Sequence, residues 1–261
     1  MYDDVAAYEA SDGVFAADIP YWERLVDELK PHRILELACG TGRILEPVAR
    51  RGLTVDPGCR IVGLDLSAPF VARARERIGA FPGLAAATTV VEGDMTAFEL
   101  DDRFDLVIVG YNSLAFVVGL DPQLRCLEAI RRHLAPGGRL AIDLVVPNAA
   151  ALGGWERTTG DRLTLDHADP IPGVRRLIRY EHDRYDPIRQ VDQTLYHDEI
   201  YLADGEVQRR TADLTWQMVY PRELELMFRV TGFRVVSRWG DYARQPFELG
   251  SGQYLWVAEA A

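Results

Sequence analysis

Short runs of valine, isoleucine and leucine alternate with segments of helical period between residues 32 and 147. Most of these runs are apolar on both faces, as the strands of a buried parallel sheet are. They are residues 32–38, 60–66, 88–92, 104–110 and 139–146. The alternation predicts parallel strands joined by helices that cover both faces of the sheet.

Three segments carry apolar residues at the spacing of an amphipathic helix: 19–30, 69–80 and 122–134. The last two begin with proline, which suits the first turn of a helix. Gly137-Gly138 follows the third segment and predicts a tight turn into the next strand.

The pattern changes after Pro147. Four β-rich stretches follow, broken by Pro170, Pro172, Pro187 and the hairpin pair Asp204-Gly205, and they span residues 163–165, 176–185, 190–202 and 210–220. One more helix and two strands are predicted at 221–230, 233–239 and 253–258. We therefore expect an α/β fold: a Rossmann-like, doubly wound, mostly parallel seven-stranded sheet with a β-rich antiparallel insertion after the fifth strand.

The same pattern predicts four parts of the chain. They are an N-terminal lid and first helix (1–31), a Rossmann-like core (32–147), the insertion (148–220), and a last helix and strand pair that complete the core (221–261).

Composition narrows the class of protein. The chain has 261 residues, 48% hydrophobic and 26% charged, with a formal net charge of −11. The acidic balance disfavours a nucleic-acid partner, because phosphate binding depends on Lys and Arg. The apolar runs are far shorter than the roughly 18 residues that a membrane span needs, and the start, Met1-Tyr2-Asp3-Asp4, lacks the features of a signal peptide. We expect a cytoplasmic protein that does not bind membranes.

The chain has three cysteines, Cys39, Cys59 and Cys126, without CxxC spacing. This pattern predicts neither a metal site nor a disulfide framework.

A glycine turn follows the first predicted strand in Glu36-Leu37-Ala38-Cys39-Gly40-Thr41-Gly42. Gly40 and Gly42 allow a sharp turn and close approach of a ligand, although a purely structural turn would use the same residues. The sequence does not match the GxGxxG motif of dinucleotide-binding proteins, because Leu45 stands at the position of the third glycine. It does not match a P-loop either, because Gly-Lys-Ser/Thr is absent. An acid before the turn, Glu36, suits a ligand with a cationic amino acid end.

Two further acids end the next strands. Asp65 lies 23 residues after Gly42, where a carboxylate accepts hydrogen bonds from ribose hydroxyls. Asp94 follows the third strand and is placed to bond an adenine amine, with Leu66 and Met95 on either side of the ring. Because the carboxyl ends of parallel strands line one crevice, we expect these groups to converge.

These motifs resemble those of the class I S-adenosylmethionine-dependent methyltransferases. The resemblance rests on residues 35–43, Asp65, residues 93–95 and the turn at 134–138, and it covers residues 18–147 well. It implies S-adenosyl-L-methionine as cofactor and S-adenosyl-L-homocysteine as product. Glu36 would then orient the methionyl ammonium, and Arg43 would either pair with the cofactor carboxylate or be solvated.

The segment after the fourth strand, residues 111–116, is similar to that of small-molecule amine methyltransferases of the glycine N-methyltransferase type, although Phe116 stands where several of them have histidine. The Asp/Asn-Pro-Pro-aromatic motif of nucleic-acid amino methyltransferases is absent there. The resemblance implies N-methylation of a small molecule. O- or C-methylation of a natural product, or a catalytically silent cofactor-binding module, stays open.

Methyl transfer depends mainly on holding the nucleophile in line and excluding water. The candidate catalytic residues are Tyr8, Tyr111 and Asn112, although Asn112 could equally serve as a turn former. The resemblance implies an N-terminal lid that carries Tyr8, and an insertion that covers the acceptor, with Trp155 and Trp216 as candidate walls. Exposed strand edges of the insertion suggest a possible homodimer.

Overall fold

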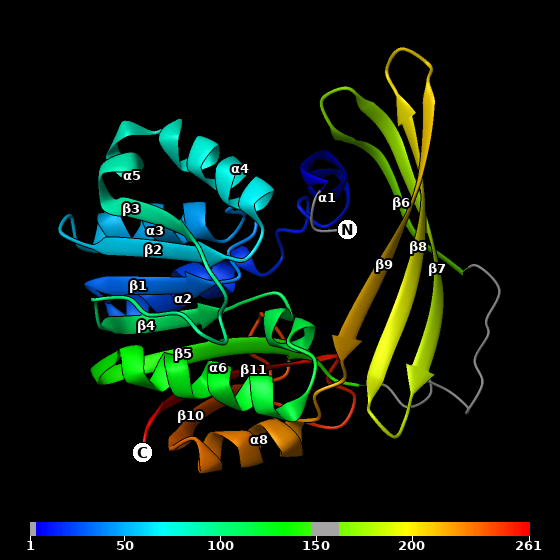
Figure 1. The fold of residues 1–261 in the computed structure, drawn as a ribbon. Coiled ribbons are helices and arrows are strands. Elements are labelled where there is room, and N and C mark those ends of the chain that lie inside the picture. Colours follow the sequence, from blue (N-terminus) through cyan, green and yellow to red (C-terminus); the bar gives the residue numbers. More distant parts are fainter. Residues whose placement is uncertain (1–3, 148–161) are drawn as a thin grey trace. The chain divides into compact units, whose positions relative to one another are not determined.

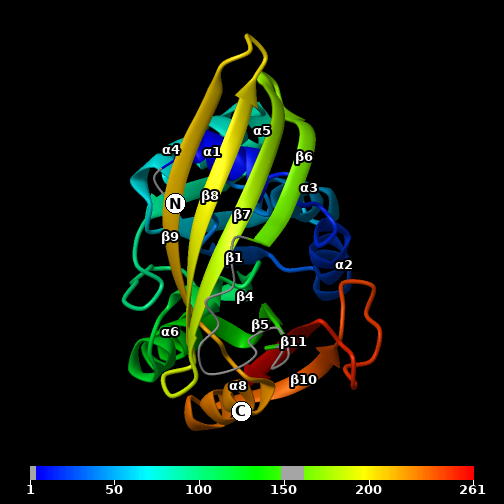
Figure 2. The same cartoon turned by 90° about the vertical axis from the view of Figure 1, so that its right-hand side faces the viewer.

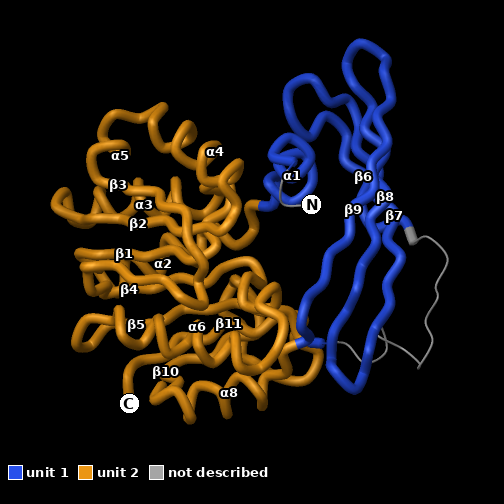
Figure 3. Tube along the Cα trace, in the orientation of Figure 1, with its two compact units in different colours: residues 1–15, 147–218 blue, residues 16–146, 219–261 orange. Residues whose placement is uncertain are grey.

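The computed structural model describes residues 4–147 and 162–261, and the chain forms two compact units (Figure 3). Unit 1 comprises residues 1–15 and 147–218, and unit 2 comprises residues 16–146 and 219–261. Each unit has a sheet of its own. Trp155 lies outside the described residues, so its predicted role stays a prediction.

Unit 2 is built on a seven-stranded sheet in the order β10-β11-β5-β4-β1-β2-β3 (Figure 1). Its strands are β1 (Arg33–Leu37), β2 (Arg60–Asp65), β3 (Thr88–Glu92), β4 (Phe104–Val109), β5 (Leu134–Val145), β10 (Phe233–Trp239) and β11 (Gln253–Ala260). The pairs from β3 through β5 are parallel, and only β11 pairs antiparallel, with β5 and β10. The predicted mostly parallel seven-stranded sheet is confirmed.

Helices cover both faces of this sheet, with α2 and α3 on one face and α6 on the other (Figures 1 and 2). The helical elements of unit 2 are α2 (Ile19–Leu29), α3 (Leu45–Val55), α4 (Ala68–Gly79), α5 (Pro82–Ala87), the 3₁₀ turn η1 (Ser113–Phe116), α6 (Leu120–His133) and α8 (Pro221–Val230). Trp22, Leu45 and Val71 are buried in one cluster with the strand residues Ile34 and Ile108. The apolar stripes of these helices therefore pack against the apolar strands and form the core of unit 2.

The start of β5 differs from the prediction. Leu134 already pairs with Phe104, and the register shifts before Leu106 pairs with Arg139. The predicted tight turn therefore lies inside the strand as an irregularity, which Gly137 permits with a φ of 79°.

Unit 1 contains the β-rich insertion, an antiparallel sheet in the order β6-β7-β8-β9 (Figure 2). Its strands are β6 (Arg162–Ile171), β7 (Val174–Asp186), β8 (Val191–Leu202) and β9 (Val207–Gln217). Asp204-Gly205 forms the predicted turn between β8 and β9. Pro170 does not end β6 but lies where its register with β7 shifts, as proline does at bulges.

Unit 1 also contains the N-terminal helix α1 (Val5–Ser11). Ala7 and Ala10 pack against Leu177 and Ile200 of the sheet, and α1 is therefore held by the insertion's own core. The predicted division of the chain at residues 31, 147 and 220 stays a prediction.

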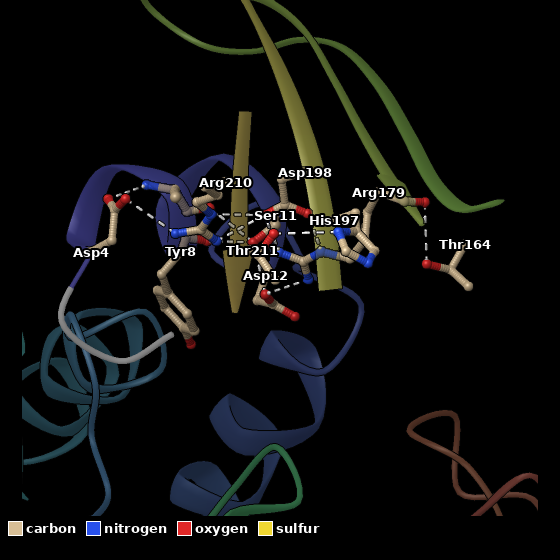
Figure 4. Close-up of polar contacts among 11 residues, drawn as sticks. Asp4, Tyr8, Ser11, Asp12, Thr164, Arg179, His197, Asp198, Arg210 and Thr211 are labelled. Carbon is tan, nitrogen blue, oxygen red and sulfur yellow. Dashed lines mark hydrogen bonds and ion pairs between the residues drawn. The ribbon is translucent and has the colours of Figure 1, made fainter. Parts of the chain in front are cut away.

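Ion pairs fasten α1 to the sheet (Figure 4). The buried Asp198 accepts hydrogen bonds from Arg179 at 2.7 and 3.1 Å and from Arg210 at 2.9 Å. Arg179 also pairs with Asp12 at 3.3 Å, and Arg210 with Asp4 at 3.1 Å. We call these five residues the Asp198 cluster.

Candidate functional site

The three predicted acids lie at the carboxyl ends of β1, β2 and β3. Glu36 is the fourth residue of β1, Asp65 ends β2, and Asp94 follows β3 by two residues. Because β1 is parallel to β2 and β2 to β3, all three residues are at the same edge of the sheet.

The glycine turn links β1 to α3. Gly40 and Gly42 have φ values of 56° and 82°, and Ala38 also has a positive φ. A side chain at Gly42 would be strained at this φ and would meet the Cβ of Ala74 at 3.4 Å. The turn therefore needs glycine here and brings its backbone close to whatever binds above it.

Asp65 ties this turn to the end of β2. One carboxylate oxygen accepts a hydrogen bond from the Gly40 N–H at 2.8 Å, and the other accepts from the Ser67 N–H at 2.9 Å. Burial raises the pKa of Asp65, whereas these N–H donors oppose the shift. The Leu66 N–H is a third donor to this carboxylate, which has about four acceptor sites in all, so it can still accept a bond from a ligand.

Two buried polar atoms near the turn have no hydrogen-bond partner among the described residues: Glu36 Oε2 and Thr41 Oγ1. Burial raises the pKa of Glu36 well above its usual range, and Arg43 only partly offsets this. Buried polar atoms are almost always bonded in folded proteins. An unsatisfied carboxylate oxygen and hydroxyl beside the turn fit a ligand that bears an ammonium group, as the amino acid end of S-adenosylmethionine does.

The groups predicted to hold a ring are more open to solvent. Leu66 is 70% exposed, Met95 is buried, and Asp94 is exposed with Oδ1 accepting from the Thr96 N–H at 2.7 Å. Adenine binding by these three residues stays a prediction.

Arg43 is engaged by the protein itself. Its guanidinium forms two hydrogen bonds with Asp18, at 2.6 and 2.9 Å, and both side chains are buried. The same guanidinium lies over the Tyr111 ring at 4.6 Å. The structure thus shows neither of the expected arrangements, and binding of the cofactor carboxylate by Arg43 stays a prediction.

Tyr111 and Asn112 form the turn after β4, and both have left-handed backbone conformations. The Tyr111 N–H donates to Asp143 Oδ1 at 2.6 Å, and Asn112 Oδ1 accepts from the Val145 N–H at 2.6 Å. The Asn112 side chain therefore supports the turn as a structural group. A catalytic role for either residue stays a prediction.

The third predicted catalytic residue, Tyr8, lies in α1 of unit 1. Its backbone oxygen accepts the N–H groups of Asp12 and Gly13 at the end of the helix, and Figure 4 shows its ring pointing away from the Asp198 cluster. Its role in catalysis also stays a prediction.

Sequence reasoning missed two residues, Asp143 and Tyr242. Asp143 is 1% exposed, and its second oxygen accepts the Tyr242 hydroxyl at 2.6 Å. Burial raises the pKa of Asp143 to about 7, against the opposing effect of the Tyr242 hydrogen bond. A single acid inside the apolar run 140–146 was a signal that could have revealed it.

A glycine turn and strand-end acids at the switch point of a doubly wound sheet define an α/β protein that binds a nucleoside-type cofactor. Residues 34–138 match a family model described as a methyltransferase domain. A cypemycin N-terminal methyltransferase from Streptomyces sp is 26% identical over 99% of this chain and 97% of its own.

Two further proteins similar to this chain are also named as methyltransferases. The structure of the CcbJ methyltransferase from Streptomyces caelestis has a TM-score of 0.77 and 26% identity, covering 100% of this chain and 98% of its own. A dTDP-3-amino-3,4,6-trideoxy-alpha-D-glucopyranose N,N-dimethyltransferase from Streptomyces venezuelae is 28% identical over 42% of this chain and 41% of its own. The chain is an S-adenosylmethionine-dependent methyltransferase.

The described parts of the chain contain no helix both long and apolar enough to cross a membrane. Within residues 4–147 and 162–261 there is also no group of three or more His, Cys, Asp or Glu side chains that could hold a metal ion.

Proposed function

We propose that this enzyme methylates the nitrogen of a small-molecule amine during the synthesis of a natural product, in the cytoplasm. The observation that carries the proposal is the similarity, over 99% of the chain and thus including the insertion, to a protein named as an N-terminal methyltransferase. The relative from Streptomyces venezuelae, named as an N,N-dimethyltransferase of an amino sugar, supports the same choice of atom.

The proposed cofactor contacts follow the geometry of unit 2. S-adenosylmethionine supplies an activated methyl group when it is bound. Glu36 accepts bonds from its ammonium group, and Gly40 and Gly42 admit it against the backbone. Asp65 accepts bonds from the ribose hydroxyls. Asp94, with Leu66 and Met95, binds the adenine ring.

The chain's contribution to catalysis is geometric. A methyl bound to sulfur needs little further activation, so most of the rate comes from aligning the acceptor nitrogen and excluding water. The Tyr111–Asn112 turn follows β4 at the edge where Glu36 and Asp65 lie. We assign this turn to the side of the site that meets the acceptor. A catalytic role for Tyr8, which belongs to unit 1, stays a prediction from the sequence.

The sheet of unit 1 offers a surface suited to a cationic acceptor. By strand register, one face carries three acids and three aromatic residues: Glu181, Asp183, Asp192, Tyr185, Tyr196 and Trp216. Asp192 is 4% exposed, and no donor among the described residues forms a hydrogen bond with its Oδ1. Burial and the neighbouring Asp183 raise the pKa of Asp192 to about 6, although Trp216 opposes this. An ammonium group bound there would satisfy Asp192 and stack on aromatic rings.

The test is transfer of labelled methyl from S-adenosylmethionine to a panel of amines, amino sugars, peptide N-termini and phenols. We expect label on amines. Label only on phenols or carbon acids would favour O- or C-methylation, and binding of S-adenosylhomocysteine without any transfer would favour a silent module.

A matched pair of variants tests the acceptor surface. Asp192→Asn removes the charge and should raise the KM for the amine about tenfold, since a hydrogen bond to a charged group is worth about 1.5–3 kcal/mol. Asp213→Asn makes the same change at an exposed residue on the opposite face of β9 and should leave KM unchanged. Equal KM values in both variants would contradict the assignment.

The remaining partner predictions follow from the same proposal. With a net charge of −11, the enzyme has no expected nucleic-acid partner. β6 and β9 are the two edges of the unit 1 sheet, and a homodimer would form through one of them. Light scattering of the full chain tests this.

A further inference from the structure

Asp143 is a buried acid within the apolar run 140–146, most of which belongs to β5. It is 1% exposed, and both of its oxygens are bonded: Oδ1 accepts from the Tyr111 N–H and Oδ2 from the Tyr242 hydroxyl, each at 2.6 Å. A buried carboxylate is costly unless such donors satisfy it. Its two donors come from segments more than 120 residues apart in sequence, so Asp143 joins the turn after β4 to the connection between β10 and β11.

The turn that Asp143 holds is strained. Tyr111 and Asn112 have φ values of 53° and 61°, and two consecutive residues other than glycine rarely adopt this conformation. The contacts that maintain it include the bond to Asp143, the bond from the Val145 N–H to Asn112, the Arg43 guanidinium over the Tyr111 ring, and the bond from the Ser113 N–H to the Gly110 carbonyl across the turn at 3.2 Å. Strained backbone persists only where its surroundings determine it in this way.

Tyr242 is itself held in place from two sides. Gln253 Nε2 of β11 donates to its hydroxyl at 3.2 Å. Two residues further on, Arg244 bonds both oxygens of Glu28 in α2 at 2.8 Å. The connection between β10 and β11 is therefore attached to α2 and β5 and is a rigid support for the Tyr242 hydroxyl.

We propose that Asp143 and Tyr242 are positioning residues for methyl transfer, which fix the Tyr111–Asn112 turn through the Asp143 carboxylate. The inference rests on the proposed function, because that turn is assigned to the acceptor side of the site. Neither residue touches the reacting atoms. Their effect is to hold the turn where the acceptor nitrogen is aligned.

The charge state of Asp143 depends on several groups around it. Asp18, before α2, disfavours the ionised form, whereas the Tyr242 hydroxyl, the Tyr111 N–H and Arg43 favour it. With a pKa of about 7, the carboxylate becomes a full acceptor for both donors only as the pH rises through neutrality.

The kinetic test compares the partly buried Tyr242 with the buried Tyr254. Tyr242→Phe removes the hydroxyl that supports Asp143, and kcat should fall about 10- to 100-fold because small misplacements are costly in an aligned transfer. The KM for the cofactor should change less than about twofold. Tyr254→Phe is the control: Tyr254 also lies in unit 2 and its hydroxyl donates to a backbone oxygen, the Val219 carbonyl, at 2.7 Å, but it has no part in the turn, so kcat should be retained.

The conservative variant Asp143→Asn separates position from charge. An amide accepts from the Tyr111 N–H and donates to the Tyr242 oxygen, which is the pattern of the protonated acid, so the variant should keep at every pH the kcat that wild type has below its Asp143 pKa. The wild-type rise in kcat through about pH 7 should be absent in the variant. Titration of the amine acceptor itself is common to both enzymes and cancels in the comparison.

A second readout needs neither cofactor nor acceptor. The ¹⁵N–¹H resonance of Tyr111 should shift with pH, with a midpoint of about 7, and should not titrate in Asp143→Asn. In Tyr242→Phe the midpoint should rise, because a donor to the carboxylate is lost.

The outcomes separate this inference from the proposed function. If no amine is methylated while the Tyr111 resonance behaves as expected, the proposed function fails and the hydrogen-bond arrangement stands. A Tyr111 resonance that titrates equally in wild type and Asp143→Asn would overturn the positioning role. So would kcat values for Tyr242→Phe and Tyr254→Phe that both match wild type.

Discussion

The two units of this methyltransferase satisfy their buried acids in different ways. In unit 1, both oxygens of Asp198 accept hydrogen bonds from Arg179 and Arg210. In unit 2, Glu36 keeps one buried oxygen with no partner among the described residues. An acid that the chain satisfies completely contributes to structure, whereas one that it leaves unsatisfied is available to a ligand.

Arg43 shows that a charged residue next to a ligand-binding motif is not necessarily left unpaired for a ligand. It follows the glycine turn directly, yet its paired guanidinium and Asp18 are as deeply buried as the Arg179–Asp198 pair of unit 1. Whether a buried charged group is structural or open to a ligand therefore depends on its hydrogen-bond partners and not on its position along the sequence.

The largest expected effect is on the fully satisfied acid. Asp198→Ala would leave Arg179 and Arg210 without their shared carboxylate in a buried setting, and loss of one partner of such a pair costs about 3–5 kcal/mol. We expect a fall of that size in the free energy of unfolding, measured with denaturant. Hydrogen exchange should increase selectively in β7, β8 and α1.

Glu199→Ala is the matched control for this variant. Glu199 is the next residue of β8 and pairs with the exposed Arg209 at 2.9 Å, a solvent-screened pair whose loss should not change stability measurably. Affinity for S-adenosylhomocysteine should be unchanged in both variants. Equal stability of the two would contradict the structural role of the Asp198 cluster.

A smaller effect is expected at Asp65, whose two oxygens accept backbone N–H groups and which we propose also accepts the ribose hydroxyls. Asp65→Asn should weaken S-adenosylhomocysteine binding about 10- to 100-fold, because a hydrogen bond to a charged group is worth about 1.5–3 kcal/mol. The measurements are calorimetry and the thermal shift on adding ligand.

Asp105→Asn provides the control for that loss. Asp105 accepts two backbone N–H groups, from His32 and Arg33 at 2.9 Å, just as Asp65 does, but it lies at the start of β4 and hence at the opposite end of the sheet. Asp105→Asn should lower the free energy of unfolding about as much as Asp65→Asn does, but its affinity for S-adenosylhomocysteine should be that of wild type. Unchanged affinity in Asp65→Asn would show that the ribose is bound elsewhere.

The contrast also explains what the sequence could predict. Apolar runs and helical periods correctly predicted a mostly parallel seven-stranded sheet and an antiparallel insertion after its fifth strand, because burial on one or two faces leaves a local pattern. The start of β5 was predicted at Arg139 but lies at Leu134, since a register shift against β4 depends on the neighbouring strand. The pairing of α1 with the insertion sheet also depends on contacts between distant segments.

For the candidate site, too, the sequence predicted the placement of residues on the strands but not their long-range hydrogen bonds. Glu36, Asp65 and Asp94 were placed at one edge by strand topology alone. By contrast, the partners of Arg43 and Asn112 lie 25 and 33 residues away, and Tyr242 reaches Asp143 from 99 residues away. Spacing along the chain carries no signal for such bonds.

The smallest expected effect compares Asp192 with Asp198, two acids of β8 on the same face of the sheet. Burial raises the pKa of Asp192 to about 6, whereas hydrogen bonds and the charges of Arg179 and Arg210 outweigh burial and lower the pKa of Asp198. A raised carboxyl pKa means that the folded chain binds the proton more tightly than the unfolded chain, whose value is about 3.9. The contribution of Asp192 is therefore greatest below about pH 4 and is lost as the pH rises through about 6.

The lowered pKa of Asp198 has the opposite sign: its contribution is present above about pH 4 and is lost as the pH falls further. Between about pH 5 and about pH 7, Asp192 alone should reduce the free energy of unfolding by about 1 kcal/mol, and Asp192→Asn should remove that part of the slope. Denaturant titrations at the two pH values measure it. A variant with the same slope as wild type would mean that Asp192 ionises normally in the folded chain, and the case for an amine held by an unsatisfied buried acid on this face would then be lost.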